Sequence, residues 1–487
     1  MLWLMPLLLA ATPAPDWPST LRADARAIHD DILANHPGPV NGADPAFRAR
    51  EAAAYALVLR RAAAVHDIAG YRFALKGYIA SFDDGHVAFG IKDESLLPTP
   101  RWPGFLTGVA ADGRQRVLAR TEAAPVPLGA ELVECDGVAA ATLVARNVGA
   151  FEGRWSLRST RATRSGWLLV DRRNPFVRRP QRCDFRIEGR ARRVTLAWTP
   201  IDPIALGRHL GPVNSFARPA IAMRTLSDGT RWFTISSFAG DPAGESAKAL
   251  TAMIAGMARD RVALGEAPAI VLDLRGNGGG SSAWSVQIAK LLWGERRMAT
   301  QAASDGSYVE WRASPATLAA LAAYEQQFAS AQNVDPKLLA YFPAITDGLR
   351  RAVAAGRPLW REPDAIAKAY QQPDTRTFAA EPVPLAGPVF VLTDPACASA
   401  CLDAVDLWRA LGAVQVGRET SADTLYMDVR DRDLPSGLAT LAVPMKVYRG
   451  RARGSNVPWR PAHRFDGDMA DVPALEHWVA SLPERRR

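Results

Sequence analysis

Apolar positions along the chain change their period twice, and the changes predict three kinds of structure. From about Pro18 to Ala80, apolar residues recur every three or four positions and predict helices. A turn-forming stretch at 81–86, Ser-Phe-Asp-Asp-Gly-His, ends this region. From about Trp102 to Trp198, short apolar runs lie between turn residues, which predicts a β-rich module.

A third unit begins near Arg218 and alternates strand-like with helix-like segments. Two of its segments, Ala269–Gly280 and Gly387–Ala400, each predict a buried strand that runs into a loop of small residues and then a helix. Such alternation is typical of an α/β core with buried, partly parallel strands. An alanine-rich stretch at about 304–373 predicts a helical insertion, for which a lid and peripheral packing are equal alternatives.

Composition describes an ordinary globular chain and argues against a nucleic-acid partner. The 487 residues are 48% hydrophobic and 22% charged, which suffices for more than one core. The formal net charge of +9 comes from scattered arginines and short Arg pairs with acids nearby, without a basic stripe that contains aromatic residues. We therefore expect a solvated arginine-rich surface and no nucleic-acid binding.

The first 14 residues, MLWLMPLLLAATPA, predict a signal peptide. Their apolar run is far shorter than the roughly 20 residues that a membrane span needs. Small residues and prolines follow it, as at a cleavage region, although the usual positive residues at the start are missing. We expect an exported protein, periplasmic or secreted, with no integral membrane segment after the leader is removed.

The four cysteines leave disulfide formation open. Cys135 and Cys183 lie within the predicted β-rich module, and an even number of cysteines permits bridges in an exported protein. Cys397 and Cys401 are not at a zinc-binding spacing, and small buried packing residues are the favoured interpretation of this pair. The sequence contains no HExxH motif and no Cys/His cluster, so we expect no metal and no cofactor.

Ser399 and a glycine run together offer the parts of an acyl-transfer site. Ser399 is predicted at the N-terminus of a helix, and the loop at 275–280 presents glycine N–H groups that a ligand can approach closely. A hydroxyl beside bare amides is an arrangement that stabilises a developing oxyanion. A serine among small residues is more often only an N-cap or a packing residue. The glycine loop is therefore what favours chemistry here.

Four motifs occur in the order of a known peptidase family. They are DDGH at 83–86, PLGAELVECDG at 127–137, LDLRGNGGG at 272–280 and VLTDPACASAC at 391–401. With these motifs the chain resembles the C-terminal-processing (tail-specific) serine peptidases and the related tricorn-core branch. The resemblance spans nearly the whole chain after the leader, and it implies a polypeptide substrate.

The resemblance also implies a multi-domain α/β fold. A leader at 1–14 would precede a helical N-terminal region at 15–95 that ends in the His86 turn. A PDZ-like β module would follow at 96–205. A crotonase-like α/β peptidase domain would occupy 206–487 and carry the helical insertion. The sequence does not predict an oligomeric state.

By the same resemblance Ser399 is the nucleophile. The two branches of the family differ in the residue that serves as the general base. The processing branch uses a lysine about two dozen residues after the serine, where this chain has Asp423. No lysine lies between Ser399 and Lys446, so a Ser/Lys dyad of that form is absent. His86 is the replacement, because an imidazole is poised to accept a proton near neutral pH. It resembles the histidine of the tricorn-type Ser/His branch, although Gly85 stands where that branch has a serine.

The resemblance further implies backbone donors for the oxyanion and an acidic residue that orients His86. The expected donors are the N–H groups of Gly278 or Gly279 and of Ala400. The sequence leaves three acids open as orienting residues: Asp84, Glu419 and Asp466.

Three other functions compete with this peptidase hypothesis. One is a catalytically degenerate peptidase fold that binds a peptide or an apolar ligand without turnover, which the departures at Gly85 and Asp423 favour. A nucleotide-binding site is a weak alternative, because the G-x-G-x-x-A match at 278–283 lacks the acid expected about 20 residues later. An α/β-hydrolase is disfavoured, since cysteines flank Ser399 where G-x-S-x-G requires glycines.

Overall fold

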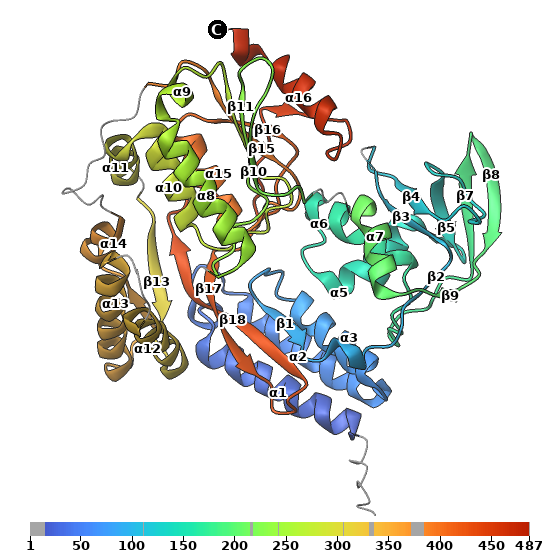
Figure 1. Cartoon of the computed structure of the whole chain (residues 1–487). Coiled ribbons are helices and arrows are strands. Elements are labelled where there is room, and N and C mark those ends of the chain that lie inside the picture. The colour runs from blue at the N-terminus through green and yellow to red at the C-terminus, as the bar shows by residue number, and fades with distance from the viewer. Residues whose placement is uncertain are drawn as a thin grey trace, which may run out of the picture.

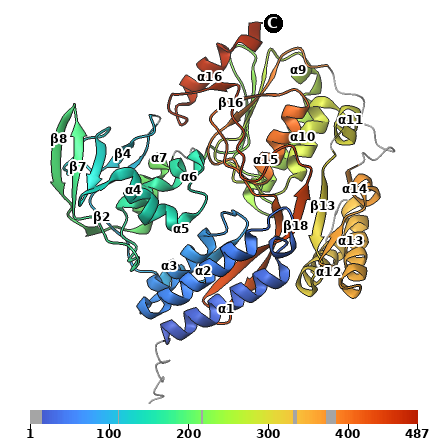
Figure 2. The same ribbon diagram turned by 180° about the vertical axis from the view of Figure 1, so that it is seen from behind.

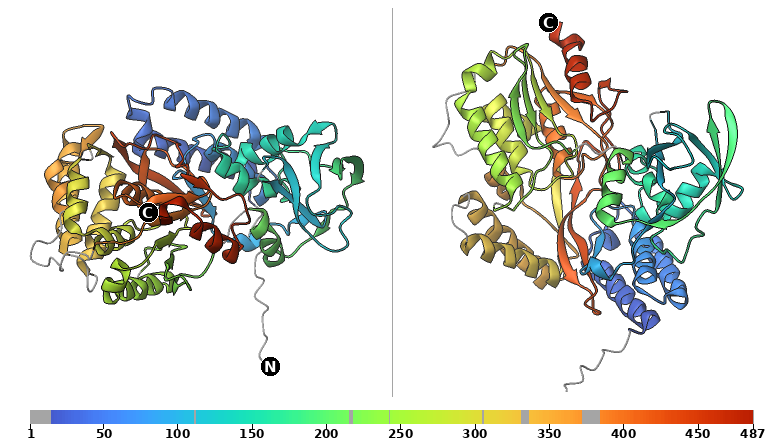
Figure 3. Two further views of the ribbon diagram at one scale, coloured as in Figure 1. Left: turned by 90° about the horizontal axis from the view of Figure 1, so that it is seen from above. Right: turned by 45° about the vertical axis from the view of Figure 1, so that its right-hand side comes forward.

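The computed structural model describes residues 15–110, 112–214, 218–241, 243–304, 306–330, 336–371 and 384–486. The predicted leader therefore lies outside the described residues. Figures 1 and 2 show three parts: helices from the N-terminal region, a β-rich module to one side, and a larger α/β part that includes the C-terminus. Two views in Figure 3 show that the β-rich module projects from the rest of the molecule.

The N-terminal helices are the ones that the apolar period predicts: α1 (Trp17–Asn35), α2 (Phe47–Arg61) and α3 (Ile68–Ala80). Asp16 caps α1 by accepting the Ser19 N–H, and Asp67 caps α3 by accepting the Gly70 N–H. After α3 the chain turns at 81–86 and enters β1 (Ala88–Ile91).

Strands from the C-terminal third complete this N-terminal part. β1 pairs antiparallel with β18 (Ala439–Arg449), which also pairs with β17 (Tyr426–Asp433). Apolar side chains of α1, α2 and α3 share one buried core with β17 and β18, including Leu21, Tyr71, Leu441 and Val443. The predicted region 15–95 is thus not a separate unit, because its core is closed by residues from the other end of the chain.

The β-rich module contains a sheet in the order β3-β4-β5-β7-β8. Its strands are β3 (Phe105–Val109), β4 (Gln115–Arg120), β5 (Glu131–Cys135), β7 (Arg182–Ile187) and β8 (Arg190–Thr195). Cys135 and Cys183 are paired across β5 and β7 and form a disulfide. The helix α7 (Pro203–Val213) packs on β3 and β4, so the predicted boundary between residues 205 and 206 falls inside this helix.

The α/β part has a mostly parallel sheet in the order β10-β11-β12-β15-β16-β19. β11, β12, β15, β16 and β19 are parallel neighbours, and β10 is antiparallel to β11. The strands are β10 (Ala222–Thr225), β11 (Arg231–Thr234), β12 (Ile270–Asp273), β15 (Val389–Thr393), β16 (Val414–Gly417) and β19 (His463–Arg464). Helices on the two faces bury separate apolar cores: α8 (Glu245–Arg259), α10 (Ala283–Trp293) and α15 (Ala400–Ala410) on one, α16 (Val472–Ala480) on the other.

The two segments singled out in the sequence form the centre of this sheet. All residues of β12 and β15 are buried, and Ile270 lies opposite Val389 in a parallel register. The loops that follow both strands therefore emerge side by side at the same edge of the sheet. This adjacency brings the glycine run next to Ser399.

The insertion is helical, as predicted, but it also contains strands that the alanine-rich pattern did not indicate. Its elements are β13 (Tyr308–Arg312), α12 (Pro315–Ser330), α13 (Pro336–Ala354), β14 (Leu359–Arg361) and α14 (Asp364–Gln371). β13 pairs with β18, and the helices pack against Trp311 and Met445 of that sheet. These contacts attach the insertion to the sheet and leave both predicted roles, lid and peripheral packing, as predictions.

Candidate active site

Ser399 lies at the N-terminus of α15 in a backbone conformation that is unusual for a side-chain-bearing residue. Its φ is 54° and its ψ is −125°, whereas non-glycine residues avoid positive φ at a cost of about 1–3 kcal/mol. Its side chain does not cap the helix. The Ser399 hydroxyl therefore does not accept a hydrogen bond from the first turn of α15. Because the backbone conformation is costly, surrounding contacts must stabilise the turn.

Two buried carboxylates hold this turn. Asp423 Oδ2 accepts a hydrogen bond of 2.6 Å from the Ser399 N–H. Asp394 accepts the Gly276 N–H at 3.0 Å and the Ala396 N–H at 2.9 Å, so it joins the glycine loop to the nucleophile turn. Burial, helped by the nearby charge of Asp273, raises the pKa of Asp394 to about 7 despite these hydrogen bonds.

A disulfide between Cys397 and Cys401 brackets Ser399. The sequence analysis favoured packing residues for this pair, and that interpretation is wrong. The spacing of four residues spans the turn into α15, where the reversal of the chain brings the two Cα atoms to 5.3 Å. The bridge adds a covalent constraint to the strained turn.

His86 and Ser399 meet across 313 residues of sequence. The distance from His86 Nε2 to Ser399 Oγ is 3.5 Å. His86 follows α3 in the turn before β1, and Ser399 follows β15, so the pairing of β1 with β18 helps bring the two elements together. This separation is at the upper limit of a hydrogen bond and suits a nucleophile and its base before substrate binds.

Of the three acids left open by the sequence, Asp84 is the one beside the imidazole. Its Oδ1 accepts the His86 backbone N–H at 2.8 Å and lies 3.6 Å from His86 Nδ1. Glu419 instead pairs with Arg460 at 3.4 Å, and Asp466 pairs with Arg464 at 2.7 Å. An acid at Nδ1 favours the tautomer whose Nε2 can accept a proton from Ser399.

The pKa directions in this cluster suit a base paired with an ionised acid. Burial alone would lower the pKa of His86, but the Asp84 contact and the charge of Asp423 together raise it above its usual value. Burial likewise opposes ionisation of Asp84, yet contacts with His36 and His86 hold its pKa well below the usual range. Asp84 is therefore a carboxylate when His86 is positively charged.

Arg154 contacts both the turn that carries His86 and the segment that carries Asp423, and it accounts for the absence of a side chain at position 85. Its backbone N–H donates to Asp83 Oδ1 at 2.7 Å, and its side chain donates to the Ala422 carbonyl at 2.6 Å and lies 3.5 Å from Asp423 Oδ1. A Cβ atom built on Gly85 would stand 2.9 Å from the Arg154 guanidinium. A serine at this position would therefore have to displace Arg154.

The glycine loop lies directly against the nucleophile turn. A Cβ on Gly279, whose φ is +103°, would lie 2.7 Å from Ser399 Cβ and 2.8 Å from the Ala398 carbonyl. The Gly279 N–H donates to Asn277 Oδ1 at 2.9 Å, so this expected oxyanion donor is already engaged. Within the described residues the N–H groups of Gly278 and Ala400 have no acceptor. They are the two expected donors that remain free.

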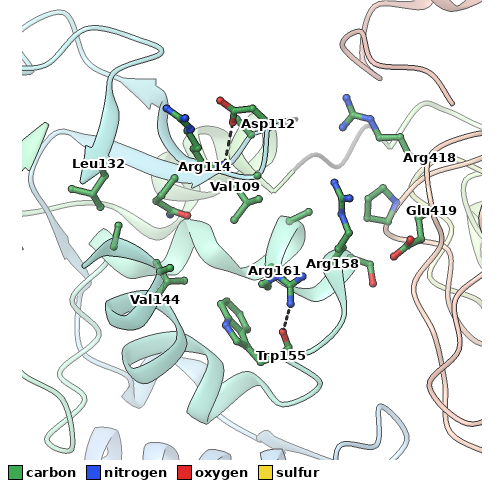
Figure 4. Close-up of a pocket in the computed structure, with 18 of the residues that line it drawn as sticks. Val109, Asp112, Arg114, Leu132, Val144, Trp155, Arg158, Arg161, Arg418 and Glu419 are labelled. Carbon is green, nitrogen blue, oxygen red and sulfur yellow. Dashed lines mark hydrogen bonds between the residues drawn. The ribbon is translucent and has the colours of Figure 1, made fainter. Parts of the chain in front are cut away.

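A cavity of about 1120 Å³ lies beside this site, and it is lined by residues of both the β-rich module and the α/β part. Figure 4 shows Arg158 and Trp155 on one wall, with Arg418 and Glu419 opposite. Pro395, in the turn that leads to Ser399, also lines it. In the described part of the chain neither Arg158 nor Arg418 has a carboxylate within ion-pair distance. The cavity thus offers positive charge close to the nucleophile turn.

One family model matches most of the α/β part. Residues 232–455 match the model described as Peptidase family S41. The matched stretch contains both loops of the site, the glycine loop and the Ser399 turn, but not His86. No curated protein sequence matches the chain.

Two solved structures of mature CPAF share the fold over nearly the whole chain. Mature CPAF is 13% identical, with a TM-score of 0.59, and the alignment covers 95% of this chain and 96% of that chain. Mature CPAF complexed with lactacystin is 13% identical, with a TM-score of 0.61 and coverage of 95% and 98%. The photosystem II D1 C-terminal processing protease is 13% identical at a TM-score of 0.34, covering 93% and 94%. The CPAF likeness is one of fold: a mixed α/β, multi-sheet architecture.

Two other features are absent from the described ranges. No helix there is both long and apolar enough to cross a bilayer. No group of three or more His, Cys, Asp or Glu side chains in those ranges is placed to hold a metal ion.

Proposed function

We propose that the chain is a serine peptidase of the Ser/His type, with Ser399 as nucleophile and His86 as general base. The contact of 3.5 Å between His86 Nε2 and Ser399 Oγ is the observation that carries this proposal. The S41 family match and the position of Ser399 beside a glycine loop support it. We assign the chain to the tricorn-like branch because Asp423 replaces the lysine of the other branch.

In this mechanism Ser399 Oγ attacks the scissile carbonyl carbon while its proton passes to His86 Nε2. Asp84 stabilises the imidazolium that forms, and the N–H groups of Gly278 and Ala400 receive the oxyanion. The C–N bond then breaks as His86 returns the proton to the leaving amine. A water molecule, deprotonated by His86, hydrolyses the acyl-enzyme and regenerates the Ser399 hydroxyl. Each oxyanion donor would contribute about 3 kcal/mol to the transition state.

The substrate in this proposal is a polypeptide that runs through the cavity between the modules. A PDZ-like module can add an extended chain end to its sheet as an extra strand. The guanidinium groups of Arg158 and Arg418, which have no carboxylate partner among the described residues, would favour acidic side chains along that path.

A fluorophosphonate probe tests the nucleophile and the base separately. We expect it to label the wild type at Ser399, to label Ser399→Ala not at all, and to label His86→Ala at a small fraction of the wild-type rate. Ser281→Ala is a matched control, because Ser281 is a half-buried serine directly after the glycine loop whose hydroxyl accepts only the Ala283 N–H. Unchanged labelling of Ser399→Ala would reject the assignment. A folded wild type that retains peptide but resists the probe would favour the degenerate, binding-only alternative.

We also propose that the protein is exported. The leader pattern at 1–14 supports this, and so do the two disulfides, since disulfides persist mainly in oxidising compartments. N-terminal sequencing of protein recovered from a periplasmic or culture fraction tests it, with a mature end near residues 11–14 expected. An intact Met1 in a cytosolic fraction would contradict export.

A further inference from the structure

The carboxylate of Asp84 lies between two histidines, only one of which takes part in the proposed mechanism. On one side Asp84 Oδ1 is 3.6 Å from His86 Nδ1. On the other side Asp84 Oδ2 is 3.9 Å from His36 Nε2. The four groups His36, Asp84, His86 and Ser399 thus form a continuous row from a fully buried ring to the nucleophile.

Three polar atoms in this row are buried and lack a hydrogen-bond partner among the described residues. They are His36 Nε2, Asp84 Oδ2 and His86 Nδ1. Buried polar atoms are nearly always paired, and each exception calls for a physical reason. His36 Nε2 faces Asp84 Oδ2 at 3.9 Å, and His86 Nδ1 faces the other oxygen, Oδ1, at 3.6 Å. A shift of less than about 1 Å in the carboxylate and rings would therefore pair all three atoms. Contacts of this kind are often long in an enzyme without substrate and tighten in the complex.

The position and the tautomer of His36 are fixed by its surroundings. The residue follows α1, is 0% exposed, stacks on Phe47 at 4.8 Å and meets Tyr426 edge-on at 4.6 Å. Its Nδ1 accepts the Gly38 N–H at 2.8 Å. A nitrogen that accepts a hydrogen bond carries no proton, so the neutral ring has its proton on Nε2, the atom that faces Asp84. Burial lowers the pKa of His36, which keeps the ring neutral.

We propose that His36 is a positioning residue, which donates its Nε2–H to Asp84 Oδ2 and thereby holds Oδ1 toward His86 Nδ1. This inference rests on the proposed Ser/His mechanism and adds a fourth member to it. His36 touches neither Ser399 nor a reacting atom, so it acts only through Asp84. A neutral donor is suited to this place, because it satisfies the buried carboxylate without cancelling the charge that supports the imidazolium.

Other charged groups near the row do not replace His36. The charges of Asp423 and Arg154 act on His86, and those of Asp44 and Arg312 act on His36. Among the described residues, none of these four side chains forms an ion pair or a hydrogen bond with Asp84. Within the described residues, the hydrogen bond from the His86 backbone N–H goes to Oδ1 and leaves Oδ2 without a donor. His36 Nε2 is the ring nitrogen that faces Oδ2.

Two substitutions at His36 separate the donor from the packing. His36→Phe keeps an aromatic ring between Phe47 and Tyr426 but removes the N–H. His36→Gln can donate from Nε2 to Asp84 while Oε1 accepts the Gly38 N–H. We expect His36→Phe to lower kcat about tenfold to a hundredfold with KM within about twofold, and His36→Gln to recover most of the loss. Equal losses in the two folded variants, or an unchanged kcat in His36→Phe, would overturn the inference.

A measurement on the wild type covers the case in which His36→Phe does not fold. ¹⁵N NMR of the imidazole groups should show His36 neutral at pH 7–8, with Nδ1 unprotonated and Nε2 protonated, and with a pKa below the ordinary value for histidine. A proton on Nδ1, or titration with an ordinary histidine pKa, would overturn the inference. The outcome is independent of turnover, so a protein with this tautomer but no reaction with fluorophosphonate would contradict the proposed function and leave the His36–Asp84 contact supported.

Discussion

The backbone N–H of Ser399 donates a hydrogen bond of 2.6 Å to the carboxylate of Asp423, which lies 24 residues further along the chain. The family resemblance leads one to expect a lysine at about this distance after the serine, and the chain has Asp423 there. This carboxylate accepts a hydrogen bond from the backbone of the serine. Asp423 therefore supports the strained turn.

We expect Asp423→Ala to lower kcat by about tenfold to a hundredfold, because the Ser399 N–H would lose its buried acceptor and the turn would relax. Asp423→Asn keeps a carbonyl oxygen for this N–H and should retain most of the activity. Steady-state kinetics with a chromogenic peptide measures both variants. If Asp423→Asn were as impaired as Asp423→Ala, the charge of Asp423 rather than its hydrogen bond would be what matters.

The pH dependence of the reaction should report the pKa of His86. Because this pKa is raised, and because the base must be neutral, kcat/KM should fall as the pH drops through a value above 6.5. Asp84→Asn removes the charge and leaves burial, which lowers the pKa. The acid limb should then move to lower pH, while the plateau at high pH falls at least about tenfold through loss of the correct tautomer. An acid limb that stays in place in Asp84→Asn would exclude Asp84 as the partner of His86.

The Cys397–Cys401 disulfide should stabilise the nucleophile turn. A chain-entropy estimate for so short a loop gives about 2 kcal/mol of folding free energy. We expect Cys397→Ser/Cys401→Ser to lower the midpoint of denaturant unfolding and to slow fluorophosphonate labelling of Ser399. Cys135→Ala/Cys183→Ala removes the bridge between β5 and β7 and is the matched control, expected to lose stability but not labelling. If labelling of Ser399 were slower only in the Cys135→Ala/Cys183→Ala control, the Cys397–Cys401 disulfide would not be the bridge that supports the nucleophile turn.

The close approach of Gly279 to the nucleophile gives a steric prediction. Gly279→Ala would place a methyl group against Ser399 Cβ and the Ala398 carbonyl at a positive φ, so we expect almost complete loss of activity. Gly278→Ala meets no heavy atom within 4 Å and provides the comparison for folding. Thermal unfolding should show little change in Gly278→Ala. An active Gly279→Ala variant would mean that the two loops are not packed as described.

Much of the scaffold was predictable from local patterns. The apolar runs before the glycine loop and before Ser399 became β12 and β15, and the helical spacing near Leu21 became α1. These predictions are confirmed because strand and helix periods are properties of neighbouring residues. The strands β13 and β14 were missed, since their pairing partners lie far along the chain and their own short runs are surrounded by good helix formers.

The site was predictable only in part. The residues that the family resemblance named, His86 and Ser399, lie together, but nothing local in the sequence relates positions so far apart. The positive φ of Ser399 could not be predicted from a local residue pattern. The Cys397–Cys401 disulfide and the hydrogen bond between Asp423 and Ser399 both form around this turn, so they were not predictable either. The neighbourhood of His36 and Asp84 arises where α1 and the 81–86 turn meet β17, which is a tertiary contact.

The pairing of β1 with β18 has a consequence for synthesis. The ribosome synthesises the N-terminal helices and the His86 turn first. Ser399 follows some three hundred residues later, and β18, the pairing partner of β1, follows after Ser399. The β1–β18 pairing that helps to place the imidazole beside the hydroxyl can therefore form only when most of the chain has been synthesised. The proposed base and nucleophile would be assembled late in translation.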